Sequence, residues 1–183
     1  MEIVKTEFVP FMKIPRLKRM CVITEKLDGT NASITITTDG QFLTGSRTRW
    51  ITPEDDNYGF SKWAHANRDE LMKLGEGTHY GEWWGQGIQR NYGLAEKRFS
   101  LFNTSRWGNE AVRPKCCHVV PVIHDGMFES NAAEVAIESL RNGGSIAVPG
   151  FMKPEGIVVF HVAANLCFKK TLEKDEEWKG KSA

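Results

Sequence analysis

The part of the sequence that most restricts the fold is the stretch NASITITTDGQFLTGS, residues 31–46. Apolar and polar residues alternate along it, so we expect Ile34 and Ile36 on one face of a strand and the neighbouring threonines on the other. Asp39 and Gly40 lie between two such runs, and this pair is the strongest short-range signal for a β-hairpin. The stretch therefore predicts antiparallel strands.

Strands recur along the chain, whereas helices are few. The apolar run MCVI leads into Lys26, and later strand-like segments are HYGEWWG, RFSLFNT, CCHVVPVI, EGIVVFHV and NLCFKK. Helices are predicted at 61–74, capped by Ser61 and ended by Gly75, and at about 131–140. The expected apolar face of the second helix is Ala132, Val135, Ala136 and Leu140. This pattern predicts an α+β fold of packed antiparallel sheets with flanking helices.

Composition adds a few limits. A chain of 183 residues can form one domain, and we expect residues 1–183 to be a single domain. The net charge of +1 excludes an overall basic field, although the basic cluster Lys13–Arg19 is a candidate RNA contact. The four cysteines contain no C-x-x-C pair, which argues against a zinc site. The sequence lacks a membrane-length apolar run and a signal peptide, so we expect a cytoplasmic protein.

Lys26 lies in TEKLDGTN, between an apolar run and a tight turn at Asp28 and Gly29. Two interpretations are open for this lysine. A lysine at a strand end beside a turn is commonly a solvated surface residue, and K-x-D-G alone does not argue otherwise. A nucleophilic lysine must first lose its proton, which desolvation and nearby cations favour, and the apolar strand provides part of that desolvation.

Three further pieces are also open to two interpretations each. Glu82 in YGEWWG is either a solvent-facing strand residue or a carboxylate that accepts hydrogen bonds from ribose hydroxyls. Glu155 precedes an apolar strand and is either exposed or a Mg²⁺ ligand. Lys169 and Lys170 end a strand and either increase solubility or neutralise a triphosphate.

Taken in chain order, these pieces resemble the motifs of the covalent nucleotidyltransferases, which include ATP-dependent polynucleotide ligases and mRNA capping enzymes. EKLDG resembles their motif I, GSRTR motif Ia, YGEWWG motif III, RFSLFNT motif IIIa, PEGIVV motif IV and LCFKK motif V. Thr30, Asn31 and the GEWWGQGIQ stretch look most like phage RNA ligases of the RNA ligase 2 type. The resemblance covers residues 22–170 and implies a ligase adenylation domain with an ATP-grasp-like fold.

The resemblance implies an ATP-dependent RNA ligase of the kind used in RNA repair, which joins 5′-phosphate and 3′-hydroxyl ends through a lysyl-AMP intermediate. Lys26 would be the nucleophile, within the K-x-D-G motif that includes Asp28. ATP would be consumed, with Mg²⁺ or Mn²⁺ as the metal, held by Glu155 mostly through water. The resemblance also implies that Glu25 lies near the adenine edge, that Asn31 orients the 5′-phosphate, and that Arg47 contacts the nucleotide or the incoming phosphate. Glu82 would bind the ribose, Phe102 would stack on the adenine, and Lys169 and Lys170 would hold the α-phosphate.

The sequence departs from the family pattern at two places. Motif V usually alternates its lysines, whereas Lys169 and Lys170 are adjacent, and we expect Lys169 to face the pocket because neighbouring strand residues face opposite ways. Little sequence follows motif V, so the OB or helical domain common in the family is not visible. The chain is then either a minimal ligase or a catalytic core cut from something larger, and a protein partner is a candidate replacement for the second domain. A minimal DNA ligase and a non-catalytic nucleotide-binding module remain alternatives, while the lack of an OB domain disfavours a capping guanylyltransferase.

Overall fold

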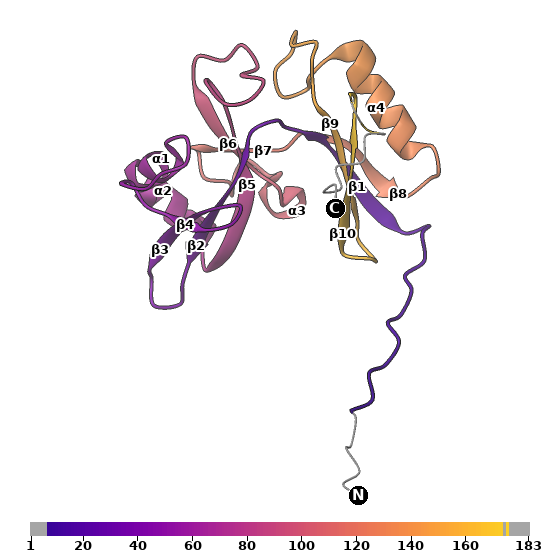
Figure 1. Cartoon of the computed structure of the whole chain (residues 1–183), viewed down its shortest axis with the longest axis horizontal. Coiled ribbons are helices and arrows are strands. Elements are labelled where there is room, and N and C mark those ends of the chain that lie inside the picture. Colours follow the sequence, from indigo (N-terminus) through magenta and orange to yellow (C-terminus); the bar gives the residue numbers. More distant parts are fainter. Residues whose placement is uncertain (1–6, 174, 176–183) are drawn as a thin grey trace, which may run out of the picture.

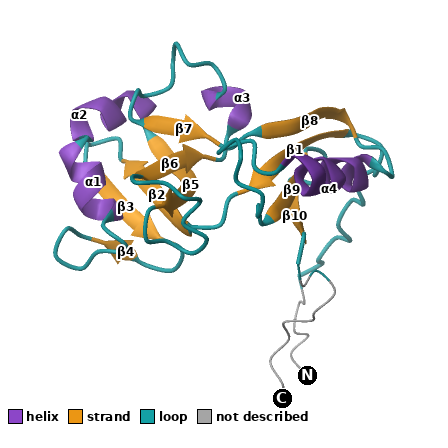
Figure 2. Ribbon diagram, turned by 90° about the horizontal axis from the view of Figure 1, so that it is seen from above, coloured by secondary structure: helices purple, strands orange, loops and turns teal. Residues whose placement is uncertain are grey.

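The computed structural model describes residues 7–173 and 175, and within them the strands form two sheets that lie side by side (Figures 1 and 2). The four-stranded sheet has the order β10-β9-β1-β8, with β1 at Met20–Lys26, β8 at Val122–Met127, β9 at Gly156–His161 and β10 at Leu166–Thr171. The six-stranded sheet has the order β4-β3-β2-β5-β6-β7, with β2 at Thr30–Ile36, β3 at Phe42–Ser46, β4 at Trp50–Ile51, β5 at Gly77–Gly85, β6 at Lys97–Leu101 and β7 at Cys117–Val119. The prediction of an α+β fold with antiparallel sheets is confirmed, except that β6 and β7 pair in parallel.

One face of the four-stranded sheet is covered by helix α4 (Ala132–Gly143) (Figure 1). Cys21 and Ile23 of β1 pack there against Ile137 and other apolar residues of α4. Because strand side chains alternate, Lys26 points to the face opposite α4. Burial of this apolar layer thus determines the direction of the lysine.

The six-stranded sheet contains the predicted hairpin, formed by β2 and β3 with Gly40 at a φ of 79°. Ile34 and Ile36 are buried in its core as the alternation predicts. Helices α1 (Phe60–Ala66) and α2 (Arg68–Leu71) and the 3₁₀ turn η1 (Met72–Leu74) cover this face (Figure 2). Trp83 of β5 packs into the same core.

The helix predicted at 61–74 is wrong in its details. It is divided into three pieces, with Asn67 between α1 and α2 and with η1 directly after α2, although Gly75 ends it with a φ of 77°. Ser61 is not the cap but a buried residue inside α1. The Asp56 carboxylate instead accepts hydrogen bonds from the backbone N–H groups of Ser61 and Lys62, at 2.7 and 2.9 Å, and so satisfies two donors of the first turn.

Helix α4 also differs from its predicted face. Val135 is 62% exposed, and Ile137, which the prediction left out, is 1% exposed and in the core. Three consecutive apolar residues at this point fit more than one helical phase, and packing on the sheet selects the phase that buries Ile137. The segment CCHVVPVI is likewise divided at Pro121 into β7 and β8, which belong to different sheets, and the short helix α3 (Thr104–Trp107) was not predicted.

A third, smaller core lies where the chain passes from one sheet to the other. It contains Leu27, which follows Lys26, together with Trp84, Tyr92 and Val120. Since Leu27 comes between β1 and β2, this core anchors the turn after Lys26 against the six-stranded sheet.

The basic cluster Lys13–Arg19 lies in an extended, exposed segment that leads into β1 (Figure 1). Its role as an RNA contact stays a prediction. In the described part of the chain, no helix is long and apolar enough to cross a membrane.

Candidate active site

Lys26 and Glu155 meet at one end of the four-stranded sheet. Lys26 is the last residue of β1 and pairs with Gly156, the first residue of β9, so Glu155 directly precedes its partner. Lys26 Nζ donates a hydrogen bond to Glu155 Oε2 at 2.6 Å, and the two side chains are only 24% and 18% exposed. The amine and the carboxylate, 129 residues apart in sequence, thus form a half-buried ion pair.

Glu82 lies on the six-stranded sheet and holds the turn that follows Lys26. Its Oε1 accepts a hydrogen bond from the backbone N–H of Gly29 at 3.0 Å, and its Oε2 accepts one from Asn31 Nδ2 at 3.1 Å. The side chain is 8% exposed, so the interpretation of Glu82 as a solvent-facing strand residue is wrong. The pairing of β2 with β5, which places Asn31 opposite Glu82, produces this arrangement.

Burial raises the pKa of Glu82 from its usual 4.5 to about 7, with Lys26 and the Gly29 N–H opposing the shift. A carboxyl group whose pKa is higher in the folded than in the unfolded state stabilises the fold most at low pH. Protein stability is therefore expected to fall as the pH rises from about 4.5 to about 7, by on the order of 3 kcal/mol. Urea unfolding across this range should show a smaller fall in Glu82→Gln than in wild type, since burial of Glu25 contributes to the fall in both proteins; equal slopes in both would contradict the prediction.

Gly29 makes the close approach of the turn to β5 possible. A Cβ at this position would lie 2.4 Å from the backbone oxygen of Trp83 and 2.7 Å from the Cβ of Trp84. We expect Gly29→Ala to lower the free energy of unfolding by about 2–3 kcal/mol, because neither neighbour can move without disturbing the sheet. Thermal unfolding measures the effect. Gly143→Ala, where a Cβ meets nothing within 4 Å, is the matched control, and an equal Tm for the two variants would contradict the prediction.

Asp28 of the same turn is held by two residues that sequence reasoning missed, Arg90 and Tyr92. The backbone N–H of Asp28 donates to Tyr92 Oη at 2.9 Å, and Arg90 Nε lies 3.0 Å from Asp28 Oδ2. Burial raises the pKa of the Tyr92 phenol above its usual value, so the phenol stays protonated. The only signal in the sequence was an arginine and a tyrosine in the glycine-rich stretch after YGEWWG.

Glu25, predicted near the adenine, has its side chain on the face of the sheet opposite Lys26. The carboxylate is 1% exposed and accepts hydrogen bonds from Ser145 Oγ at 2.6 Å and from the backbone N–H groups of Ile146 and Ala147 at 2.8 and 3.0 Å. Burial raises its pKa, which the three hydrogen bonds oppose. The side chain therefore anchors the segment after α4, which leaves the Glu25 backbone as the part that could meet a base.

The register of β10 separates the two adjacent lysines. Lys169 pairs with Val158, which in turn pairs with Thr24, so Lys169 shares the face of Lys26. Lys170 shares the α4 face, where its Nζ lies 2.9 Å from Glu134 Oε1 of that helix. The geometry thus agrees with the expectation that Lys169 faces the site.

Arg47 and Phe102 lie just beyond strands of the six-stranded sheet. Arg47 follows Ser46, the partner of Ala32, and is exposed at the end of the sheet where Asn31 lies. Phe102 follows β6, is 41% exposed, and its backbone N–H donates to Tyr80 O at 3.0 Å. Phe102 is thus available for stacking.

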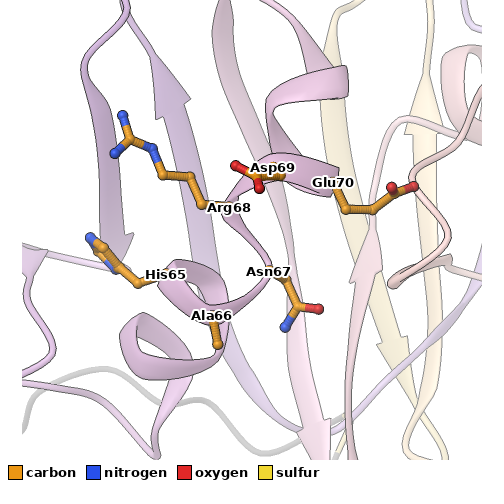
Figure 3. A pocket seen from close by; sticks show the side chains of 6 residues that line it. All are labelled: His65, Ala66, Asn67, Arg68, Asp69 and Glu70. Carbon is orange, nitrogen blue, oxygen red and sulfur yellow. The ribbon is translucent and has the colours of Figure 1, made fainter.

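A separate depression of about 310 Å³ lies where α1 meets α2 (Figure 3). Its lining residues are His65, Ala66, Asn67, Arg68, Asp69 and Glu70. We call the following residues the group around Lys26: Lys26 itself, Asp28, Glu82, Arg90, Tyr92, Glu155 and Lys169. None of the residues that line the depression belongs to this group, so the depression contributes nothing to that site.

The chain resembles solved structures of the Naegleria gruberi RNA ligase in fold. An apo mutant of that ligase matches with a TM-score of 0.63 at 21% identity, over 88% of this chain and 53% of that one. The same ligase with pyrophosphate matches with a TM-score of 0.62 at 22% identity, over 88% and 53%. A mutant with ATP and Mn gives a TM-score of 0.62 at 20% identity, over 90% and 53%. The chain thus spans about half the length of these structures.

No curated protein sequence matches the chain. The family model described as RNA ligase, in contrast, matches residues 19–172. This match covers most of the chain and includes every residue of the group around Lys26. The chain therefore belongs to the RNA ligase family.

Proposed function

We propose that the protein is an ATP-dependent RNA ligase in which Lys26 becomes covalently adenylylated. The observation that carries the proposal is the half-buried ion pair of Lys26 with Glu155, beside a turn held by Glu82, in a chain of the RNA ligase family. The ion pair fixes the position of the Lys26 amine, and a nucleophile must be held in place before it can attack a bound phosphate.

The proposed reaction has three steps. The neutral Lys26 amine attacks the α-phosphorus of ATP, so that an N–P bond forms, the bond to the bridging oxygen breaks, pyrophosphate leaves and the nitrogen releases a proton to solvent. The 5′-phosphate of an RNA end then attacks the same phosphorus, the N–P bond breaks, and the Lys26 nitrogen takes up a proton to regain its amine. Finally, a 3′-hydroxyl attacks the activated 5′-phosphate, loses its proton, and releases AMP as the new phosphodiester forms. Positioning and charge neutralisation provide most of the catalysis in such phosphate chemistry.

The remaining site residues would bind the nucleotide and the phosphates. Lys169, on the face of Lys26, would neutralise the α-phosphate, and Arg47 would contact the nucleotide or the incoming phosphate. Glu82 would bind the ribose and Phe102 would stack on the adenine, which needs no hydrogen-bond recognition. Asn31 would orient the 5′-phosphate. Lys170 lies near Glu134 on the other face, so its predicted nucleotide contact has less support.

The donor chemistry of the site fits Mg²⁺ or Mn²⁺. Among the described residues there is no group of three or more His, Cys, Asp or Glu side chains that could enclose a metal. A Mg²⁺ ion bound to nucleotide usually takes only one or two carboxylates, together with water and phosphate oxygens. Glu155 would provide the carboxylate, and the ion would neutralise charge on the phosphates. The Naegleria ligase structures with ATP and Mn support ATP and a divalent cation as the ligands.

The test is to incubate the protein with Mg²⁺ and ATP or GTP labelled at the α-phosphate, and then to offer 5′-phosphorylated nicked RNA, nicked DNA or single strands. We expect label on the protein from ATP but not GTP, and transfer to RNA. Transfer only to DNA would favour the alternative of a minimal DNA ligase. If neither nucleotide labels the protein, the proposal fails, and the non-catalytic nucleotide-binding module becomes the favoured alternative.

Three expectations remain predictions from the sequence. They are the assignment of residues 1–183 to a single adenylation domain, a protein partner in place of a second domain, and a cytoplasmic location. The likeness to the RNA ligase 2 type also rests on Thr30, Asn31 and the GEWWGQGIQ stretch alone.

A further inference from the structure

The loop between β5 and β6, residues 86–96, has an unusual backbone. Gln89, Asn91 and Tyr92 all have positive φ, at 44°, 60° and 55°. Residues with side chains rarely adopt this conformation, and it costs free energy unless surrounding contacts compensate. Strain of this kind concentrates at functional sites, so the contacts made by the loop indicate what it does.

The side chain of Tyr92 is fixed in the core between the sheets. It is 2% exposed, its ring centroid lies 4.8 Å from that of Trp84, and Phe151 packs on it at 4.6 Å. The phenol oxygen accepts the hydrogen bond from the Asp28 N–H, two residues after Lys26. The strained loop thus delivers a buried acceptor to the turn of the nucleophile.

Arg90 of the same loop contacts both Asp28 and the segment that leads to Glu155. Its Nε is buried and forms an ion pair with Asp28 Oδ2 at 3.0 Å, without the geometry of a hydrogen bond. Its Nη1 donates to the backbone oxygen of Lys153 at 3.2 Å, two residues before Glu155. One loop of the six-stranded sheet therefore contacts both segments that carry the Lys26–Glu155 pair.

We propose that the β5–β6 loop is a positioning clamp, in which Tyr92 and Arg90 hold Asp28 and so align the Lys26 amine for attack. The inference rests on the proposed function, because alignment matters only if Lys26 is a nucleophile. Tyr92 and Arg90 are positioning residues, since they act through Asp28 and the segment before Glu155. Misplacement of a reacting group lowers the rate of the chemical step more than it weakens substrate binding.

The informative change is Tyr92→Phe, which keeps the ring packed against Trp84 and Phe151 and removes only the acceptor of the Asp28 N–H. Tyr58→Phe is the matched control, because Tyr58 also has a positive φ, of 51°, but its side chain is half exposed. Two measurements are made on each variant of the 183-residue chain. Amide hydrogen exchange at Asp28 is followed by NMR without ATP, and the single-turnover rate of labelling is followed across ATP concentrations.

For Tyr92→Phe we expect exchange at Asp28 to be at least about fivefold faster. We also expect the maximal labelling rate to fall about tenfold, with less than a twofold change in the ATP concentration at half-maximal rate. Tyr58→Phe should change none of these. If exchange at Asp28 is unchanged in Tyr92→Phe, the clamp proposal is wrong. If exchange is faster but the labelling rate is normal, the loop holds Asp28 but does not position Lys26.

The two measurements also separate this inference from the proposed function. A wild-type protein that takes no label from ATP overturns the proposed function and, with it, the positioning role. Exchange at Asp28 then still decides whether Tyr92 holds the turn. A circular dichroism melt of each variant shows whether it is folded, and if Tyr92→Phe is unfolded, Arg90→Lys replaces it. We expect Arg90→Lys to lower the maximal labelling rate in the same way, because lysine retains the charge near Asp28 but cannot also reach Lys153; normal labelling would overturn the clamp.

Discussion

Lys26→Arg is expected to abolish covalent labelling by ATP, with a loss of roughly a thousandfold or more. Arginine keeps a positive charge beside Glu155, so the ion pair and the fold should survive. A guanidinium cannot lose its proton at accessible pH, however, and so provides no nucleophile. Quantified label on a denaturing gel, together with a thermal melt, measures both effects.

Lys73→Arg is the matched control for this change, because Lys73 also pairs with a glutamate, Glu70, but on the surface. It should label at the wild-type rate. If Lys26→Arg retained even a tenth of wild-type labelling, another residue would be the nucleophile and the role of Lys26 would be wrong.

Glu155→Gln should produce the second-largest loss, roughly a hundredfold or more in the rate of labelling. The amide has almost the same shape but lacks the negative charge that pairs with Lys26 and that would hold a divalent cation. Because the loss acts partly through the metal, raising Mg²⁺ or substituting Mn²⁺ should recover part of the rate. Single-turnover labelling at several metal concentrations measures it.

Glu110→Gln is a suitable control, since Glu110 pairs with Arg113 at a position where the glutamate side chain is 88% exposed. Wild-type rates in Glu155→Gln at every metal concentration would remove Glu155 from the site. A uniform loss that no metal concentration changes would instead leave Glu155 as a partner of Lys26 alone.

Local patterns were enough to predict the hairpin and the strand that ends at Lys26. Alternation around Ile34 and the Asp39-Gly40 pair predicted the hairpin, and the apolar run before Lys26 predicted a strand that ends at the lysine. These features depend on neighbours in sequence, so a single chain contains the necessary information. Alternation also predicted that only one of Lys169 and Lys170 faces the site, and the register of β10 selects Lys169.

Contacts between distant segments could not be predicted in the same way. The burial of Glu82 against Gly29 and Asn31 follows from the register of β5 on β2, which no local pattern specifies. The clamp by Arg90 and Tyr92 requires positive φ at residues other than glycine, which propensity disfavours and only tertiary contacts impose.

The phase of α4 could not be predicted either, for the same physical reason. Val135 and Ile137 are equally apolar candidates for the core, and the sheet beneath the helix buries one and leaves the other exposed. The segment CCHVVPVI is a further example. Its residues belong to strands of two different sheets, and composition alone does not reveal that Pro121 marks the boundary between them.

The central claim, that Lys26 carries the AMP, is tested most directly by locating the adduct. The protein is incubated with ATP and Mg²⁺, digested under conditions that preserve a phosphoramidate, and its peptides are sequenced by mass spectrometry. We predict AMP on the peptide that contains TEKLDGTN, attached at Lys26. Adduct on another lysine such as Lys169, or no adduct on any peptide, would contradict the account.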